Sequence, residues 1–475
     1  MSTIRTLVKN TSVLFLSQMI GYVLAFLYTL YSARYLGTTN FGIISFATAI
    51  SGLFAIFTDL GLSTLTIREV ARDKTGMIKL ILSIITMIGL VLFVNIGVFN
   101  ETTKLVVYII GSSVIIDAFS GTFTSMFRAY EQMEYQSIAE IINSVTMFIG
   151  VLFCVFTKQS VIGVASIYLI STVLVLIYNF AMCTKNYGLI HFQVNLKLWK
   201  YLIYTAFPLA ITSIFALISF KMNTILLNIL TTSAHVGEYT AAFNLMQALI
   251  FIPTVYSTAI LPIFSKFYVN RPDMLEYSYK KSLKYLTILS VPISMGTMVL
   301  SKKIILFMYG SAYINTIPVL ELIIWALPAI FLSYILGTSI ASINKQHETV
   351  KATFICLLFS TIGNFILIKL FDSTGAAMIT VINEVSMVLF YMYIMHKYGY
   401  SVPLRSILLK PFIASVVMGG VIYLLDLDLF VSIGVGIIVY FTTILLIKTF
   451  NEDDWNIFKQ LLPQKVLKYI ENRME

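Results

Sequence analysis

The chain has 475 residues, of which 58% are hydrophobic and only 11% are charged. Because soluble domains carry roughly 25% charged residues, this composition excludes a water-soluble fold and indicates a polytopic membrane protein. The apolar runs are long and continuous, which favours transmembrane helices of about 20 residues. A membrane β-barrel would instead show alternating segments of about 10 residues.

Apolar runs separated by polar or charged breaks predict fourteen transmembrane helices. Six lie in the first half of the chain, at residues 11–33, 41–62, 78–99, 105–127, 137–157 and 160–182. Six more lie in the second half, at residues 202–230, 238–262, 282–300, 317–341, 350–371 and 374–396, and a final pair lies at 404–424 and 429–448. The segment 202–230 is longer than one span requires, so we expect it to be tilted or to extend beyond the bilayer.

The 32 basic residues predict the orientation of these helices, because Lys and Arg concentrate in cytoplasmic connections. The predicted connections on the side of the N-terminus hold 25 Lys and Arg residues, whereas those on the opposite side hold six. Both termini are therefore expected in the cytoplasm. The net charge of +10 is explained by cytoplasmic loops that face anionic headgroups, so no nucleic-acid partner is expected.

An internal repeat predicts how the chain is divided. Residues 121–153 resemble residues 337–368, and a second similarity pairs residues 38–42 with residues 231–237. The repeat is six helices long, and an even number of spans returns the chain to the same side, so the two halves are expected to be parallel bundles. We predict four parts: an N-terminal six-helix bundle at 1–185, a second six-helix bundle at 186–400, an additional helix pair at 401–450 and a cytoplasmic amphipathic tail at 451–475.

The sequence contains no pattern typical of an enzyme or a metalloprotein. Its three cysteines and four histidines are scattered, without metal-ligand or disulfide spacing, so we expect no metal site and no cofactor. Phosphate loops, Gly-rich nucleotide fingerprints and nucleophile motifs are absent from the sequence. A membrane-embedded glycan polymerase is expected, by analogy, to carry a large external loop. The short loops of this chain therefore favour a transporter over a membrane enzyme.

Two basic residues at helix positions are candidates for contacts with an anionic substrate. Lys221 lies inside a predicted span, where a charge is costly and asks for a partner, water or a function. The alternative is that its side chain snorkels to the outer interface. Arg34 ends the first helix, where it is either an interfacial anchor or a cavity residue. Asp59 is expected either to cap its helix or to pair with Arg68 or Arg72 in the loop at 68–74.

Three acidic residues within predicted spans are candidates for ion coupling. Asp117 lies near the middle of the fourth helix, Glu384 near the middle of the twelfth and Glu321 toward the outer end of the tenth. A buried carboxyl group that exchanges protons suits ion coupling. The alternative is an acid neutralised by a buried partner such as Lys221.

Four motifs carry a resemblance to a known family. They are the first hairpin, ARYLG, FG and DLG at residues 33–61; the loop REVARDK at 68–74; the turn FRAYEQMEY at 127–135; and VGEYTAAF at 236–243. Together they resemble the polysaccharide biosynthesis flippases, which share a superfamily with the multidrug-and-toxin exporters.

The resemblance implies a flippase that moves polyprenyl-(pyro)phosphate-linked oligosaccharide across the plasma membrane by alternating access between two bundles. Its implied partners are the lipid-linked glycan and membrane lipids, and it allows glycan-assembly proteins as further partners. Helices one, two, seven and eight line the cavity in this family, and cationic side chains suit a diphosphate. Arg34 and Lys221 are the candidates by position. Asn223 stands where an aspartate is common, which argues against an acid-dependent step there.

The same superfamily supplies the alternative, a cation-coupled multidrug exporter. Such a protein would favour acidic groups in its cavity, and Asp117 and Glu384 fit that requirement.

Overall fold

The computed structural model describes residues 2–59, 76–187, 200, 214–215, 217–401 and 403–454, and these residues form helices and turns without a β-strand. Ten helices within these ranges are long and apolar enough to cross a membrane, and shorter apolar helices lie at Ile81–Ile96 and Leu217–Leu230. Because two of the long helices are bent and each covers two predicted spans, the described helices overlap all fourteen predictions. The expected all-α polytopic membrane fold is confirmed.

The two bent helices are α1 (Ser2–Asp59) and α13 (Gln346–Lys397). In α1 the bend lies at Gly37, which has φ 71° and ψ 176°. Glycine adopts a positive φ without the steric penalty that a Cβ atom imposes. In α13 the bend lies at Asp372, with φ 50° and ψ −126°, an uncommon conformation for a residue with a side chain. The connections between the predicted spans 11–33 and 41–62, and between 350–371 and 374–396, are therefore sharp bends within continuous helices.

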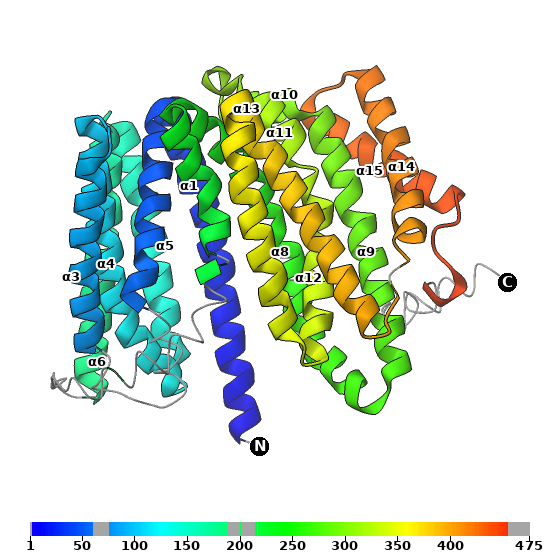
Figure 1. Cartoon of the computed structure of the whole chain (residues 1–475), viewed down its shortest axis with the longest axis horizontal. Helices are drawn as coiled ribbons and strands as arrows, with labels where there is room; N and C mark the ends of the chain where they lie inside the picture. The colour runs from blue at the N-terminus through cyan, green and yellow to red at the C-terminus, as the bar shows by residue number, and fades with distance from the viewer. Residues whose placement is uncertain are drawn as a thin grey trace. The chain divides into compact units, whose positions relative to one another are not determined.

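The helices that follow α1 pack against it and against one another, as Figure 1 shows. They are α3 (Gly76–Ile96), α4 (Glu101–Ala129), α5 (Met133–Phe156) and α6 (Val161–Tyr187). Left-handed residues at Glu131 and Lys158 make the tight turns between α4, α5 and α6. A buried hydrogen bond of 2.8 Å from Asn179 to Ser120 joins α6 to α4, because polar groups among apolar helices need partners.

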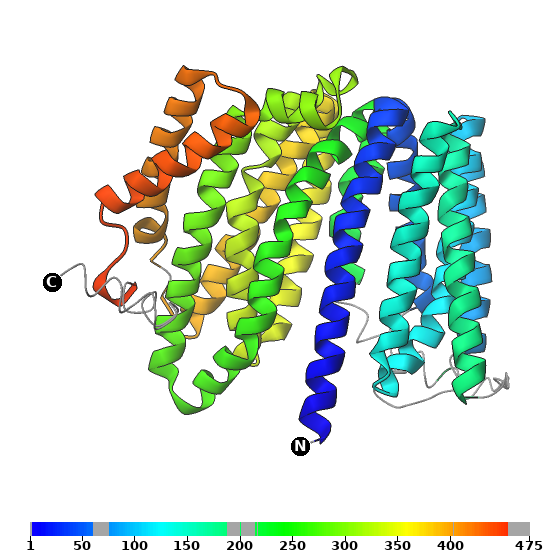
Figure 2. The same ribbon diagram turned by 180° about the vertical axis from the view of Figure 1, so that it is seen from behind.

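The second half of the chain continues beyond the helix Leu217–Leu230. Its elements are α8 (Ser233–Asn270), α9 (Pro272–Val299), α10 (Ser301–Met308), η1 (Ser311–Tyr313), α11 (Thr316–Ile323), α12 (Ala326–Ser342), α13, α14 (Leu404–Leu425) and α15 (Leu429–Leu446). Both α12 and α14 pack against α9 (Figure 2). In addition, the buried hydroxyl of Tyr440 in α15 donates a 2.7 Å hydrogen bond to the carbonyl oxygen of Ile288 in α9.

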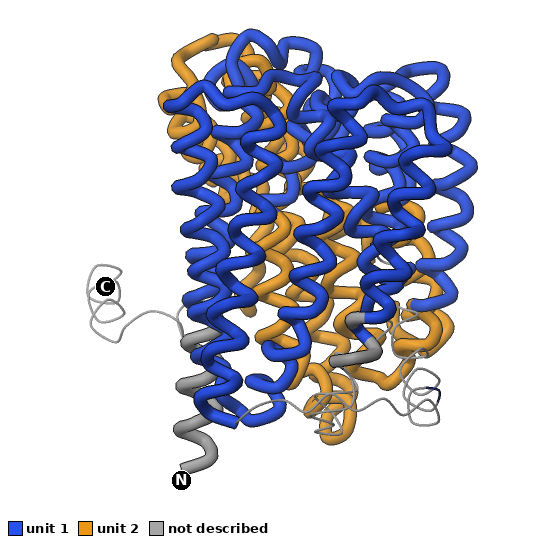
Figure 3. Tube along the Cα trace, turned by 90° about the vertical axis from the view of Figure 1, so that its left-hand side faces the viewer, with its two compact units in different colours: residues 1–249, 305–323, 350–383 blue, residues 250–304, 324–349, 384–475 orange. Residues whose placement is uncertain are grey.

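Figure 3 shows the two compact units into which the helices group. Unit 1 consists of Met1–Leu249, Ile305–Ile323 and Val350–Asn383, and unit 2 consists of Ile250–Ile304, Ile324–Thr349 and Glu384–Glu475. In unit 1, Phe123 and Phe127 of α4 lie in a buried cluster with Cys183 of α6. In unit 2, α9, α14 and α15 share a core around Met295 and Met418. The predicted division at residues 185, 400 and 450 stays a prediction.

Several predicted features lie outside the described residues. They are the REVARDK loop at 68–74, the tail beyond residue 454, and residues 188–199 and 201–213, which include the beginning of the predicted span 202–230.

Candidate functional site

Arg34 lies three residues before the bend of α1, and its side chain is exposed. Its Nη1 atom donates a hydrogen bond of 3.3 Å to the carbonyl oxygen of Phe307 in α10. Next to it, the carbonyl oxygen of Ala33 accepts a 2.8 Å bond from the hydroxyl of Tyr313 in η1. A guanidinium group carries five N–H donors, so the bond to Phe307 leaves most of its donor capacity for an anion. The bend therefore positions the predicted cationic side chain at an exposed place.

The two segments whose similarity predicted the repeat contact each other just beyond this bend. A Cβ atom at Gly42 would lie 1.7 Å from the carbonyl oxygen of Ser233, and a Cβ atom at Gly237 would lie 2.0 Å from the carbonyl oxygen of Thr38. Only glycine permits an approach this close. The second half of α1 and the beginning of α8 therefore cross at equivalent positions of the repeat.

Lys221 lies within the helix Leu217–Leu230, and its side chain is half-buried. Its Nζ atom is 5.6 Å from the centre of the Phe220 ring, and that ring packs edge-on against Phe243 of α8. An aromatic face attracts a cation electrostatically, which reduces the cost of placing an ammonium group in this region. The role of Lys221 in substrate contact stays a prediction.

A polar network begins two residues beyond Lys221. The side-chain nitrogen of Asn223 donates to Tyr239 at 3.1 Å and to Thr380 at 2.8 Å, and its oxygen accepts a 2.7 Å bond from Asn364. Asn364 is fully buried, and such amides require hydrogen-bond partners in apolar surroundings. The network joins the helix Leu217–Leu230 to α8 and α13. At the position where the family resemblance suggests an aspartate, this chain therefore holds a hydrogen-bonded amide, which does not titrate.

Two further polar pairs lie between α8 and the bend of α13. Glu238 is only 5% exposed, and its carboxylate accepts a 2.9 Å hydrogen bond from the hydroxyl of Ser373. His235 lies 3.6 Å from the carboxylate of Asp372, the residue at the bend. Glu238 is not among the site residues predicted from the sequence. The signal that points to it is an acidic residue within the first two turns of an otherwise apolar helix.

Lys79 of α3 forms an ion pair with Asp59 and acts electrostatically on Asp117. The Lys79 ammonium group lies 2.9 Å from a carboxylate oxygen of Asp59, and it also interacts electrostatically with Asp117 of α4. Lys79 lies at the beginning of the predicted span 78–99, and its side chain is only 1% exposed. Lys221 was the predicted partner of a buried acid, whereas the cation that acts electrostatically on Asp117 in the structure is Lys79. The signal that points to Lys79 is a basic residue in the first turn of an apolar helix.

Four of the five predicted site residues belong to unit 1, namely Arg34, Asp117, Lys221 and Glu321. Glu384 belongs to unit 2. Asp117 is exposed on α4, whereas Glu321 on α11 and Glu384 on α13 are half-buried. The functions assigned to these five residues stay predictions.

Comparison with known proteins identifies relatives that match nearly the whole chain. The probable low-salt glycan biosynthesis flippase Agl15 of Haloferax volcanii is 24% identical over 477 aligned positions, which cover 96% of this chain and 99% of that protein. The capsular polysaccharide biosynthesis protein CapF of Staphylococcus aureus is 23% identical over 401 positions, which cover 81% of this chain and 98% of that protein.

A solved structure supports the same assignment of fold. The lipid II flippase MurJ in an inward closed conformation superposes with a TM-score of 0.74 at 18% identity, covering 92% of this chain and 98% of that one. The family model described as "Polysaccharide biosynthesis protein" matches residues 7–268, more than half of the chain. The motifs of the first hairpin lie within this match, and the family expectation drawn from them is confirmed. The chain is thus a multi-pass membrane protein that belongs to the polysaccharide biosynthesis protein family.

Proposed function

We propose that the chain is a flippase that moves polyprenyl-(pyro)phosphate-linked oligosaccharide across the plasma membrane by alternating access, for assembly of a cell-surface glycan. The observation that carries this proposal is the family match, together with relatives that align with 96% and 81% of this chain and are named for glycan or capsule biosynthesis. In the proposed topology both termini are cytoplasmic and Arg34 lies on the outer side.

The local chemistry of Arg34 and Lys221 supports a substrate that carries phosphate. A guanidinium or ammonium group binds phosphate oxygens through charge-assisted hydrogen bonds, which are about twice as strong as neutral ones. Arg34 is exposed, and its described hydrogen bond is to a neutral backbone carbonyl oxygen, that of Phe307. Lys221 is half-buried beside an aromatic ring, so its charge is less screened than a surface charge.

The test is rescue of surface glycan in cells that lack their own flippase of this type. We expect the wild-type chain to restore the glycan, and Arg34→Ala and Lys221→Ala to abolish rescue at normal protein levels. Lys302→Ala is the matched control, because Lys302 is an exposed lysine that the topology places on the same side as Arg34. Full rescue by both site variants would overturn the role of these cations.

A direct measurement tests translocation itself. The purified chain is reconstituted into vesicles that contain a fluorescent polyprenyl-pyrophosphate oligosaccharide, and the fraction that a membrane-impermeant reagent reaches is followed over time. We expect this fraction to rise only in vesicles that contain the protein. If the substrate stays inaccessible while the protein instead confers resistance to toxic organic cations, the function is drug export.

A further inference from the structure

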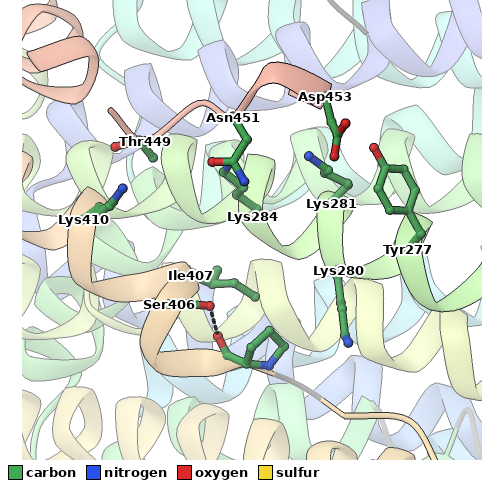
Figure 4. Close-up of a pocket in the computed structure, with 11 residues that line it drawn as sticks. Tyr277, Lys280, Lys281, Lys284, Ser406, Ile407, Lys410, Thr449, Asn451 and Asp453 are labelled. Carbon is green, nitrogen blue, oxygen red and sulfur yellow. Dashed lines mark hydrogen bonds between the residues drawn. The ribbon is translucent and has the colours of Figure 1, made fainter. Parts of the chain in front are cut away.

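A cavity of about 390 Å³ opens in unit 2, where one end of α9, one end of α14 and the segment after α15 come together. Four lysines line it, Lys280, Lys281, Lys284 and Lys410, and the remaining lining residues include the acidic Asp453 as well as Tyr277 and Asn451 (Figure 4). Its volume lies within the range of about 300–1,000 Å³ that is usual for small-ligand sites.

Helical spacing explains why the cations gather there. Lys280 and Lys281 follow Tyr277 by three and four residues along α9, and Lys284 follows them by four and three, so the four side chains share one face of that helix. From the first two turns of α14, Lys410 adds a fourth ammonium group to the cavity. Each of these helix ends belongs to a candidate membrane span, so the cavity lies at the end of the spans, where lipid headgroups are found.

Three acids offset part of this charge, namely Asp453 on the cavity lining and Asp454 and Glu276 beside it. Asp454, which is fully buried, accepts hydrogen bonds from Lys281 and Lys284 as well as from the hydroxyl of Tyr285. Lys280 pairs with Glu276 at 2.6 Å. In contrast, Lys410 donates a 2.7 Å bond to a backbone carbonyl oxygen, that of Lys448, and is exposed.

An ammonium group carries three donors, so each of these lysines has donors beyond the described bonds. Asp454 also holds Lys281 and Lys284 in fixed positions, so less side-chain entropy is lost when an anion binds to them. A preorganised group of cations beside hydroxyl and amide groups suits a phosphate, whose oxygens accept several charge-assisted hydrogen bonds.

We propose that this cavity binds the phosphate group of a membrane lipid headgroup. Two carriers present that chemistry at a membrane surface, namely an anionic phospholipid and a polyprenyl phosphate. Its lining residues all belong to unit 2 and do not include Arg34 or Lys221. The proposal does not depend on transport, so it stands or fails independently of the flippase function.

The test is lipid binding to the full-length chain purified in detergent, measured by native mass spectrometry. Phosphatidylglycerol, a polyprenyl monophosphate and zwitterionic phosphatidylcholine are added separately at equal concentration. We expect at least one of the two anionic lipids to be retained more strongly than phosphatidylcholine, and the retained lipid identifies the carrier. Equal retention of all three lipids, or binding of soluble inorganic phosphate alone, overturns the proposal.

The matched variants test whether the lipid occupies this cavity. Lys280→Gln combined with Lys410→Gln should weaken retention of the anionic lipid roughly tenfold, while Asp454 keeps both of its lysines. Lys345→Gln is the control, because Lys345 is on the same predicted membrane side but stacks on Tyr398 outside the cavity. Unchanged retention in the double variant overturns the proposal. If that variant loses its thermal unfolding transition, Lys410→Gln alone, which leaves the Glu276 pair intact, is measured instead.

Discussion

The ammonium group of Lys79 lies 2.9 Å from a carboxylate oxygen of Asp59, and this ion pair joins α3 to the end of α1. The two partners differ in environment, because the side chain of Lys79 is 1% exposed and that of Asp59 is 40% exposed. A buried charge without a partner is strongly unfavourable, whereas an exposed charge is solvated by water. The pair therefore matters more to Lys79 than to Asp59.

This difference predicts unequal effects of removing the two partners. Asp59→Asn should lower the unfolding temperature of the purified chain more than Lys79→Gln, because it removes a carboxylate that lies 2.9 Å from a buried ammonium group. The expected cost is about 2 kcal/mol, the scale of a lost charge-assisted hydrogen bond. Thermal unfolding in detergent measures both variants. Equal shifts, or a larger shift for Lys79→Gln, would contradict the interpretation.

The close contact of α1 and α8 at Gly42 and Gly237 predicts that alanine at either position impairs folding. Gly42→Ala and Gly237→Ala each place a Cβ atom within 2.0 Å of a backbone carbonyl oxygen, so both should reduce the yield of folded protein sharply. Gly52→Ala in the same helix α1 has no neighbouring atom within 4 Å of the new Cβ. It should fold at least as well as the wild type, because alanine favours a helix by about 1 kcal/mol over glycine. Size-exclusion chromatography of the expressed variants distinguishes these outcomes.

The amide network predicts a loss of stability that depends on burial. Asn223→Leu removes the hydrogen bonds that Asn364, Tyr239 and Thr380 make with this side chain, so it should cost about 1–3 kcal/mol. Asn95→Leu on α3 is the control, because Asn95 is exposed and bonds only within its own helix. The two unfolding temperatures should differ by several degrees. A control as unstable as Asn223→Leu would show that the network contributes nothing specific.

Asp454 predicts a dependence of stability on pH. Burial opposes its ionisation, but the hydrogen bonds from Lys281 and Lys284 hold the pKa of its carboxyl group well below the ordinary value. The pKa of an aspartate in an unfolded chain is about 3.9. The stabilisation is therefore fully present above that pH and is lost as the pH falls through the lower pKa of the folded state.

The measurement compares the unfolding temperatures of the wild type and Asp454→Asn across pH. Their difference should be constant above about pH 5 and should shrink at lower pH. Asp426→Asn is the control, because Asp426 pairs with Lys303 at 2.6 Å but is 82% exposed, and exposed ion pairs contribute little. A difference that grows on acidification would contradict the sign derived for Asp454.

The ion-coupling candidates Asp117 and Glu384 predict that transport depends on a proton or sodium gradient. If Asp117 or Glu384 exchanges a proton or binds sodium during transport, then Asp117→Asn or Glu384→Gln should abolish the dependence of transport on the matching gradient. Transport into vesicles with imposed proton or sodium gradients measures this dependence. A gradient dependence that persists in both variants would assign these acids a structural function.

The sequence predicted the helices well because a bilayer imposes a length and a composition that can be read locally. It also identified the corner at Gly37 and the paired segments that cross at Gly42 and Gly237. The bends were less predictable, because a sharp bend at Asp372 and a short polar turn look alike in the sequence. Residues 301–316 lie between two predicted spans, and they form α10 and η1. These elements were not predicted, because such short helices have too few apolar positions to show a helical period.

The partners of charged side chains were the least predictable part of the site. Lys79 is separated from Asp59 and Asp117 by 20 and 38 residues, and only the packing of α1, α3 and α4 brings the three together. The lysine cavity depends in the same way on α9, α14 and the end of α15. The charge of a residue is visible in the sequence, but its burial is a property of the packed helices.

The crossing of Gly42 and Gly237 has an evolutionary consequence. Because each repeat offers its glycine to the backbone of the other, the contact has the form of an isologous interface, in which equivalent surfaces of two subunits meet. A single ancestral half with this glycine would already have carried a self-complementary surface for dimerisation. Fusion of two such copies would preserve the contact and allow each half to diverge. The candidate cations Arg34 in the first half and Lys221 in the second differ in residue type and position.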